Sequence, residues 1–244
     1  MTDQECVQFL RWVLPRLHMR WAGFRKVRRQ VCKRFQRRLQ VLGLPTLSTY
    51  RDYLEHTPSE WRVADELCRI TISRFYRDRE VFDRLCGPVL RLLAATAERS
   101  GRRRLTAWSI GCGCGEEPYT LAIATRLAPA PASKVDLSIL ATDVDSTLLA
   151  RARAARYRRS SLKDLPPAWL EQAFDLTPSG YCLRAPYGTA VRWELQDIRT
   201  TLPTGHFDLI LCRNMAFTNF DDQLQGDILA RLLAILEPGG VLVV

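Results

Sequence analysis

The feature that most constrains the fold is an apolar run that enters a glycine-rich turn and continues as a helix. Leu105–Ile110 has the length and apolar character of a buried strand, and Glu117-Pro118 marks an early helical position, where proline gives up no intrahelical hydrogen bond. Between them lie three alternating glycines, Gly111, Gly113 and Gly115. A strand, a glycine-rich turn and a helix in this order let the backbone approach a ligand closely at the carboxyl edge of a parallel sheet.

The alternation of strand and helix continues toward the C-terminus. The sequence predicts further strands at Val135–Ala141 and Phe207–Cys212, and a helix from about Ser146. A last amphipathic helix, ended by Pro238, is marked by Leu224, Ile228, Leu232, Ile235 and Leu236. This order predicts an α/β fold in which helices cover both faces of a parallel sheet.

The remaining regions predict the domain organisation. Residues 1–95 are expected to form an all-helical N-terminal domain that includes a linker helix, and residues 96–244 an α/β domain. Turn residues that separate Tyr181-Cys-Leu183 from Val191-Arg-Trp193 predict a small β-hairpin insertion at about 174–193. The chain ends in the apolar run Val241–Val244, so we expect a C-terminally truncated sheet, because such a domain usually continues for further strands.

The composition fits a soluble globular protein. Of the 244 residues, 47% are apolar and 25% charged, and no apolar run approaches the roughly 18 residues needed to span a bilayer. The N-terminus lacks the pattern of a signal peptide, so we expect a cytoplasmic protein without membrane insertion. The eight cysteines form no C-x-x-C pair and have no histidine at metal-ligand spacing, which favours free thiols in a reducing compartment and no metal site.

The positive charge is concentrated in one segment. The net charge is +10, and the ten Lys and Arg residues between Arg16 and Gln40 are accompanied by no Asp or Glu. Apolar residues recur every fourth position in this segment, at Val27, Val31, Phe35 and Leu39. The pattern predicts an amphipathic helix whose arginine-rich surface, over residues 25–40, is either a solvated helix face or a docking site for an acidic partner.

Acidic residues near the glycine-rich turn indicate a nucleoside cofactor. Asp143 ends the next predicted strand, where a carboxylate can accept hydrogen bonds from both ribose hydroxyls. Glu116 and Glu117 follow the third glycine and would repel the pyrophosphate of a dinucleotide such as NAD, whereas adenosylmethionine has no phosphate and carries positive charge. The two glutamates could instead simply stabilise the helix N-terminus, and for Glu116 we favour that interpretation.

Four motifs, in order, carry a resemblance to a known family. They are Ile72-Ser-Arg-Phe-Tyr-Arg77, Trp108-Ser-Ile-Gly-Cys-Gly-Cys-Gly-Glu-Glu-Pro-Tyr119, Leu140-Ala-Thr-Asp-Val-Asp145 and Phe207-Asp-Leu-Ile-Leu-Cys-Arg-Asn214. Over about residues 25–244 the sequence resembles the CheR-type protein-glutamate O-methyltransferases. The resemblance implies a small helical domain followed by a Rossmann-like class I methyltransferase domain. It also implies S-adenosyl-L-methionine as cofactor, S-adenosyl-L-homocysteine as product, and the coiled coil of a chemotaxis receptor as the acidic protein substrate.

The resemblance also assigns site residues by matching motif. It implies that Thr71, Ser73 and Arg77 contact the amino-acid end of the cofactor, and that Arg77 is in addition the catalytic candidate. It places Glu117 at the sulfonium end, Asp143 at the ribose, Asp197 and Ile198 beside the adenine, and Arg213 and Asn214 at the closing wall of the pocket. Three alternatives stay open: Ile198 as plain core, Arg213 as a solvated strand end, and Arg77 paired with a nearby acid.

The expected reaction needs no general base, because a free glutamate side chain has a pKa of about 4.3 and is already ionised. The three histidines, His18, His56 and His206, accordingly have no recognisable catalytic setting. The segment Met215–Asp221 departs from the family, since it is one residue longer and lacks a tyrosine near the reaction centre. Two alternatives therefore remain: a methyltransferase for RNA or a small molecule, and a non-catalytic module that senses adenosylmethionine.

Overall fold

The computed structural model describes residues 2–127 and 135–244, which form two compact units. The N-terminal unit comprises the residues up to Thr71 together with Asn214–Asp227, and the second unit comprises Ile72–Arg213 and Ile228–Val244. The boundary thus lies at Thr71 and not near residue 95. The reason is that helix α7 (Leu90–Arg99) buries its apolar side against the sheet of the second unit.

The N-terminal unit is helical, as the sequence predicts. Its helices are α1 (Asp3–Arg16), α2 (Trp21–Phe24), α3 (Arg28–Leu42), α4 (Leu47–His56), α5 (Glu60–Cys68) and α12 (Ala216–Asn219). The predicted stripe on α3 is buried at Val31, Phe35 and Leu39. Gly43 ends α3 with a φ of 66°, a left-handed conformation that glycine adopts without steric cost.

Two cysteines of this unit correct the expectation of free thiols. Cys6 on α1 and Cys32 on α3 form a disulfide, although they lie 26 residues apart in sequence. No spacing rule could identify the pair, because the two thiols meet only when α1 packs against α3. The other six cysteines form no disulfide.

A buried carboxylate holds three helices of this unit together. Glu60 on α5 is 4% exposed and accepts two hydrogen bonds from the Arg38 guanidinium of α3, at 2.8 and 2.7 Å. The hydroxyl of Tyr50 on α4 donates a third, at 2.7 Å. Burial alone would raise the pKa of Glu60, but the hydrogen bonds from Arg38 and Tyr50 lower it below its ordinary value.

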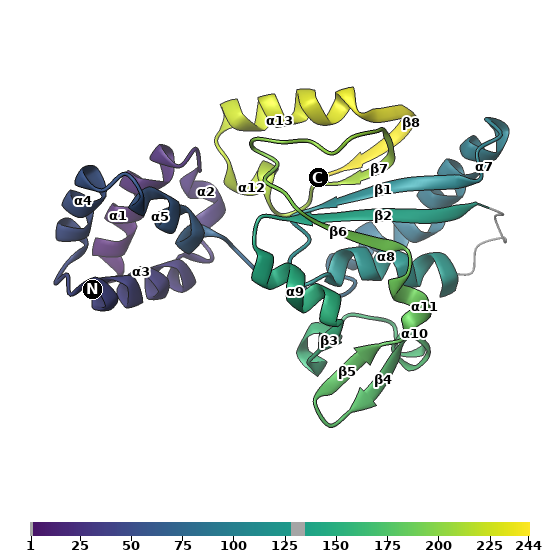
Figure 1. The fold of residues 1–244 in the computed structure, drawn as a ribbon, viewed down its shortest axis with the longest axis horizontal. Helices are drawn as coiled ribbons and strands as arrows, with labels where there is room; N and C mark the ends of the chain where they lie inside the picture. The colour runs from purple at the N-terminus through teal and green to yellow at the C-terminus, as the bar shows by residue number, and fades with distance from the viewer. Residues whose placement is uncertain (1, 128–134) are drawn as a thin grey trace. The chain divides into compact units, whose positions relative to one another are not determined.

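The second unit is built on a parallel sheet with the strand order β6-β2-β1-β7-β8. The strands are β1 (Arg104–Ile110), β2 (Asp136–Asp143), β6 (Val191–Leu195), β7 (Phe207–Leu211) and β8 (Leu236–Val243). The helices and helical turns along this part of the chain are α6 (Arg79–Arg84), the π-helical turn η1 (Leu85–Val89), α7, α8 (Glu116–Leu127), α9 (Ser146–Ala154) and α13 (Asp222–Ala234). The predicted α/β architecture is confirmed (Figure 1).

The predicted hairpin insertion is only partly correct. A small antiparallel sheet of order β3-β5-β4 stands apart from the main sheet in Figure 1, and it contains β3 (Arg156–Tyr157), β4 (Phe174–Thr177) and β5 (Gly180–Leu183). The neighbouring helical segments are η2 (Arg159–Ser161), α10 (Pro167–Ala173) and α11 (Ala185–Gly188). The predicted second hairpin strand, Val191–Trp193, instead joins the main sheet as β6, parallel to β2, because Trp193 packs against Tyr119 of α8.

None of the described helices is both long enough and apolar enough to cross a membrane.

We expect Glu60→Gln to lower the free energy of unfolding by about 2 kcal/mol at pH 7, because the amide keeps only part of the hydrogen bonding to Arg38. The folded-state pKa of Glu60 lies below its unfolded value, so its contribution is present above the unfolded pKa and is lost as pH falls through the folded pKa. Urea unfolding of wild type and variant should therefore converge below about pH 4. Glu55→Gln, at a half-exposed ion pair with Arg51, is the control, with an expected change under about 0.5 kcal/mol. An equally small effect of Glu60→Gln would contradict the assignment of Glu60 as a carboxylate that stabilises the N-terminal unit.

Candidate active site

The glycine-rich turn after β1 has a left-handed backbone that glycine adopts without steric cost. Gly111, Gly113 and Gly115 all have positive φ, at 65°, 58° and 90°. A Cβ on Gly115 would lie 2.8 Å from the Trp193 ring, whereas a Cβ on Gly113 would meet only the Ser73 side chain, at 3.8 Å. The Trp193 ring thus packs against the turn at Gly115, whereas at Gly113 there is room for a ligand to approach the backbone.

Asp143, at the end of β2, holds this turn in place. One oxygen of its carboxylate accepts from the Gly113 N–H at 2.8 Å, and the other accepts from the Asp145 N–H at 3.0 Å. The N–H of Gln196, which follows β6, donates to the Asp143 carbonyl at 3.0 Å. The carboxyl ends of β1, β2 and β6 therefore meet at Asp143, at the edge where α/β sheets bind ligands.

Two buried glutamates begin α8. Glu117 accepts from the Ser109 hydroxyl at 2.9 Å and from the Arg213 guanidinium at 3.0 Å. Glu116 is 5% exposed and has the Ser73 hydroxyl as a partner, while its Oε2 has no hydrogen-bond partner among the described residues. Burial raises the pKa of both carboxyls, against the opposing effect of these partners.

The segment Ile72–Asp78 crosses the start of α8. The Phe75 N–H donates to the Ser161 carbonyl at 2.9 Å, and the Tyr76 N–H donates to the Thr120 hydroxyl at 3.1 Å. Tyr76 and Asp78 are both left-handed, with φ of 57° and 61°. Two such residues within three positions indicate a backbone held against its local preference, as is common at functional sites.

Arg213, which follows β7, joins this segment to α8. Its side chain is 4% exposed and donates to Glu117, to Asp78 at 2.6 Å and to the Arg77 carbonyl at 3.1 Å. Its guanidinium also lies 5.1 Å from the centre of the Phe82 ring. The alternative that Arg213 is a solvated strand end is therefore wrong.

The arrangement fits adenosylmethionine better than a dinucleotide. An acidic residue stands at the end of β2, and the start of α8 carries buried carboxylates, one with an unpartnered oxygen, where a dinucleotide would place its pyrophosphate. Negative charge at this point attracts a cofactor with an ammonium and a sulfonium group.

A family model described as "CheR methyltransferase, SAM binding domain" matches residues 71–244. The chain belongs to the CheR methyltransferase family. As a CheR methyltransferase it uses S-adenosylmethionine as its cofactor, in agreement with the charge pattern of the site.

Named relatives agree with this family. The chemotaxis protein methyltransferases of Salmonella typhimurium (strain LT2) and of Escherichia coli (strain K12) are each 32% identical to the chain, over 88% of it and 74% of their own length. The solved N-methyltransferase NodS from Bradyrhizobium japonicum WM9 is 18% identical with a TM-score of 0.37, and the match covers 68% of this chain and 62% of NodS. The chain thus spans less than two thirds of that solved structure, and a likeness of this size says nothing about substrate.

Most of the predicted CheR site residues lie together in the second unit. These are Ser73, Arg77, Gly111, Gly113, Gly115, Glu117, Asp143, Asp197, Ile198 and Arg213. Thr71 and Asn214 belong to the N-terminal unit, and their roles stay predictions, as do all the individual cofactor contacts. Asp197 forms an ion pair with Arg199 at 2.7 Å, and Ile198 beside it is 5% exposed.

Sequence reasoning missed two polar residues here, Ser109 and Asp78, which are hydrogen-bond partners of the Glu117 and Arg213 pair. It favoured helix stabilisation for Glu116, which carries the unpartnered oxygen. A signal for Asp78 was present, because it directly follows the Arg77 motif. The three histidines lie elsewhere: His18 pairs with Asp221, His56 with the Asp52 carbonyl, and the His206 carbonyl accepts from Thr106.

We expect Glu116→Gln to stabilise the protein in the absence of cofactor. The pKa of Glu116 in the folded protein is raised above its value in the unfolded chain. The neutral carboxyl therefore contributes stability below the unfolded pKa, and that contribution is lost as pH rises through the folded pKa, because the buried group then becomes charged. The variant should melt about 3 °C higher at pH 7.5, and this gain should vanish near pH 4. The exposed Glu171→Gln is the control, with no change expected. A lower melting temperature of Glu116→Gln at pH 7.5 would contradict the assignment.

Proposed function

We propose that this methyltransferase modifies glutamate carboxylates of an acidic protein, specifically a chemoreceptor recognised through its coiled coil. The relatives named above are chemotaxis protein methyltransferases. The observation that carries the proposal is the charge pattern of the site, in which Arg77 and Arg213 accompany buried carboxylates while all three histidines lie elsewhere. An acceptor that is already an anion needs no base.

We assign to Arg77 the binding of a carboxylate, either that of the acceptor or that of the cofactor. Its Nη1 donates to the Ile72 carbonyl at 2.7 Å, which orients the guanidinium within its own segment, and the side chain is 29% exposed. The bound cofactor supplies the methyl group. Arg77 would hold an anionic carboxylate by charge-assisted hydrogen bonds, so its contribution is alignment.

The basic helix provides the proposed docking surface. Of its cations, Arg28 forms an ion pair with Asp3, Arg38 with Glu60, and Arg34 donates to the carbonyls of Leu67 and Arg69. Five exposed cations of the segment form no ion pair within the described part of the chain: Arg25, Lys26, Arg29, Lys33 and Arg37. Arg29, Lys33 and Arg37 recur every fourth residue along α3, so they form one cationic stripe.

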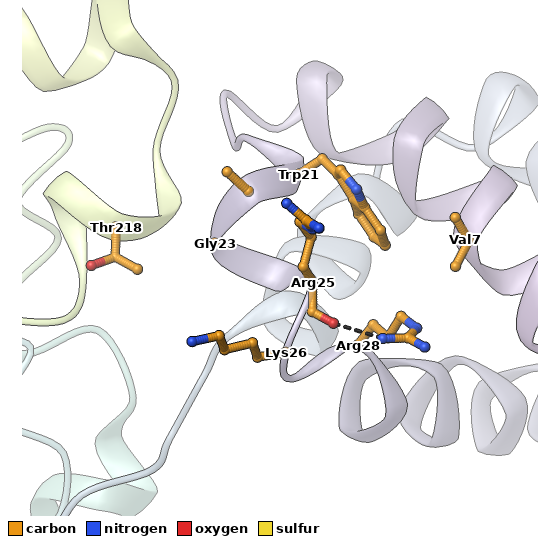
Figure 2. A pocket seen from close by; sticks show the side chains of 8 residues that line it. Val7, Trp21, Gly23, Arg25, Lys26, Arg28 and Thr218 are labelled. Carbon is orange, nitrogen blue, oxygen red and sulfur yellow. Dashed lines mark hydrogen bonds between the residues drawn. The ribbon is translucent and has the colours of Figure 1, made fainter.

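A cavity of about 690 Å³ lies within the N-terminal unit, and Arg25, Lys26 and Arg28 of the basic segment line it. Figure 2 shows Arg25 beside Trp21 and Lys26 farther away, with Thr218 of α12 also lining the cavity. A rim of cations around an apolar lining suits a protein surface that carries acidic and apolar side chains together. We therefore include Arg25 and Lys26 in the docking surface.

The segment that departs from the family pattern is held by this same unit. The Arg20 guanidinium donates to the Phe217 carbonyl at 2.6 Å, and Met19 pairs with Phe220 in a β-bridge. Its anchoring supports a role for Met215–Asp221 in acceptor choice.

Binding to RNA remains the competing proposal for the arginines, and it predicts an affinity that falls steeply with salt. The relatives' names favour the protein acceptor, and they also favour turnover over a purely sensing module.

We expect charge reversal of the stripe to abolish methylation without loss of cofactor binding. The assay incubates enzyme, adenosylmethionine labelled in the methyl group and an acidic receptor coiled coil, and counts label released by base, because esters of carboxylates are hydrolysed by base. Arg29→Glu, Lys33→Glu and Arg37→Glu combined should lower this count at least about tenfold at low salt. The control reverses Arg91, Arg103 and Arg104, exposed residues of the second unit, with the same change in net charge. Equal activity of both triple variants would exclude the docking role, and base-stable label would exclude the carboxylate acceptor.

The proposal includes a cytoplasmic location, where thiols are kept reduced. Under that condition Cys6 and Cys32 would be reduced in cells, although the structure contains them as a disulfide. Rapid alkylation of the protein inside cells should then modify eight cysteines after denaturation, the six outside the disulfide plus this pair. Modification of only six would place the chain in an oxidising environment.

A further inference from the structure

The Arg213 guanidinium has two acidic partners, although a single carboxylate would be enough to neutralise its charge. Asp78 accepts from Nη2 at 2.6 Å, and Glu117 accepts from Nη1 at 3.0 Å. Arg213 is 4% exposed, and a buried guanidinium needs at least one such partner because an unpaired buried charge is very costly. Asp78, at the shorter distance, can meet that need without Glu117.

The two carboxylates have different surroundings. Asp78 is half-exposed in its side chain, at 49%, whereas the Glu117 side chain is 16% exposed and lies at the start of α8 beside Ser109. The Arg77 Nε lies 4.0 Å from the same Asp78 carboxylate, so the cluster holds two guanidiniums and two carboxylates. If Asp78 were neutral, the cluster would carry one net positive charge and would repel a cation.

We propose that Asp78 is a positioning residue that occupies Arg213, so that the Glu117 carboxylate stays available to the positively charged end of the cofactor. This inference rests on the cofactor role proposed for Glu117. It also explains the backbone at this point, because the left-handed Asp78 directs its carboxylate to Arg213 directly after Arg77, whose carbonyl accepts from the same guanidinium.

The test is Asp78→Asn, which removes the charge but keeps a side chain that tolerates the left-handed conformation. Asp83→Asn is the matched control, because Asp83 lies on the neighbouring helix α6 and accepts from the Tyr76 hydroxyl at 2.8 Å. Asp78→Glu restores the charge and should restore part of the binding. Affinities for adenosylmethionine and adenosylhomocysteine are measured by calorimetry, together with the melting temperature of each cofactor-free protein.

We expect Asp78→Asn to weaken adenosylmethionine binding by about ten- to a hundredfold. Binding of adenosylhomocysteine, which lacks the sulfonium charge, should weaken less, and a purely structural defect would not produce that difference. Asp83→Asn should bind both ligands as the wild type does. Equal losses for the two ligands, or wild-type affinity in Asp78→Asn, would overturn the proposal.

Glu117→Gln gives a second test that does not depend on the folding of the Asp78 variant. If Asp78 suffices as the partner of Arg213, this variant keeps the wild-type melting temperature while it loses adenosylmethionine binding. A large drop in melting temperature would show that Glu117 is committed to Arg213 and would overturn the inference. Failure of the wild-type protein to bind either ligand would instead refute the cofactor site itself, so the two failures are distinguishable.

Discussion

A single buried guanidinium organises the second unit at the point where the chemistry is expected. Arg213 leaves the end of β7 and reaches both α8, through Glu117, and the segment Ile72–Asp78, through Asp78 and the Arg77 carbonyl. A buried charge is tolerated only with close partners. The contacts of Arg213 therefore hold the end of β7, the start of α8 and the segment Ile72–Asp78 together. The left-handed Asp78 is held by one of these contacts, and the left-handed Tyr76 by the hydrogen bond from its N–H to the Thr120 hydroxyl.

The site around this arginine is built to be negative before any cofactor is present. Glu116 and Glu117 are buried at the start of α8, where the helix dipole favours negative charge, yet burial still raises the pKa of both. Asp143 adds a third carboxylate, which the backbone N–H groups of Gly113 and Asp145 hold in place. Such a concentration of buried charge reduces stability in the free protein, and it preorganises the site for a cationic ligand.

Arginine has different tasks in the N-terminal unit, and the sequence does not separate them. Arg38 completes a buried pair with Glu60, Arg34 donates to carbonyls after α5, and Arg20 holds the segment around Phe217. Arg29, Lys33 and Arg37 remain exposed on α3. The basic block is therefore partly structural, and the stripe, together with Arg25 and Lys26, is left for a partner.

The sequence by itself determined what depends on local pattern: the helices of the N-terminal unit, the strands β1, β2 and β7, the glycine-rich turn, and Asp143 at the end of its strand. Tertiary structure decided what depends on contacts between distant residues. Val191–Trp193 reads as a hairpin strand, but the packing of Trp193 beside Gly115 and Tyr119 places it in the main sheet. The Cys6–Cys32 pair, the boundary at Thr71 and the link from Asp78 to Arg213 have the same origin. Periodicity reports which face of an element is apolar, and it cannot report which distant side chain will meet that face.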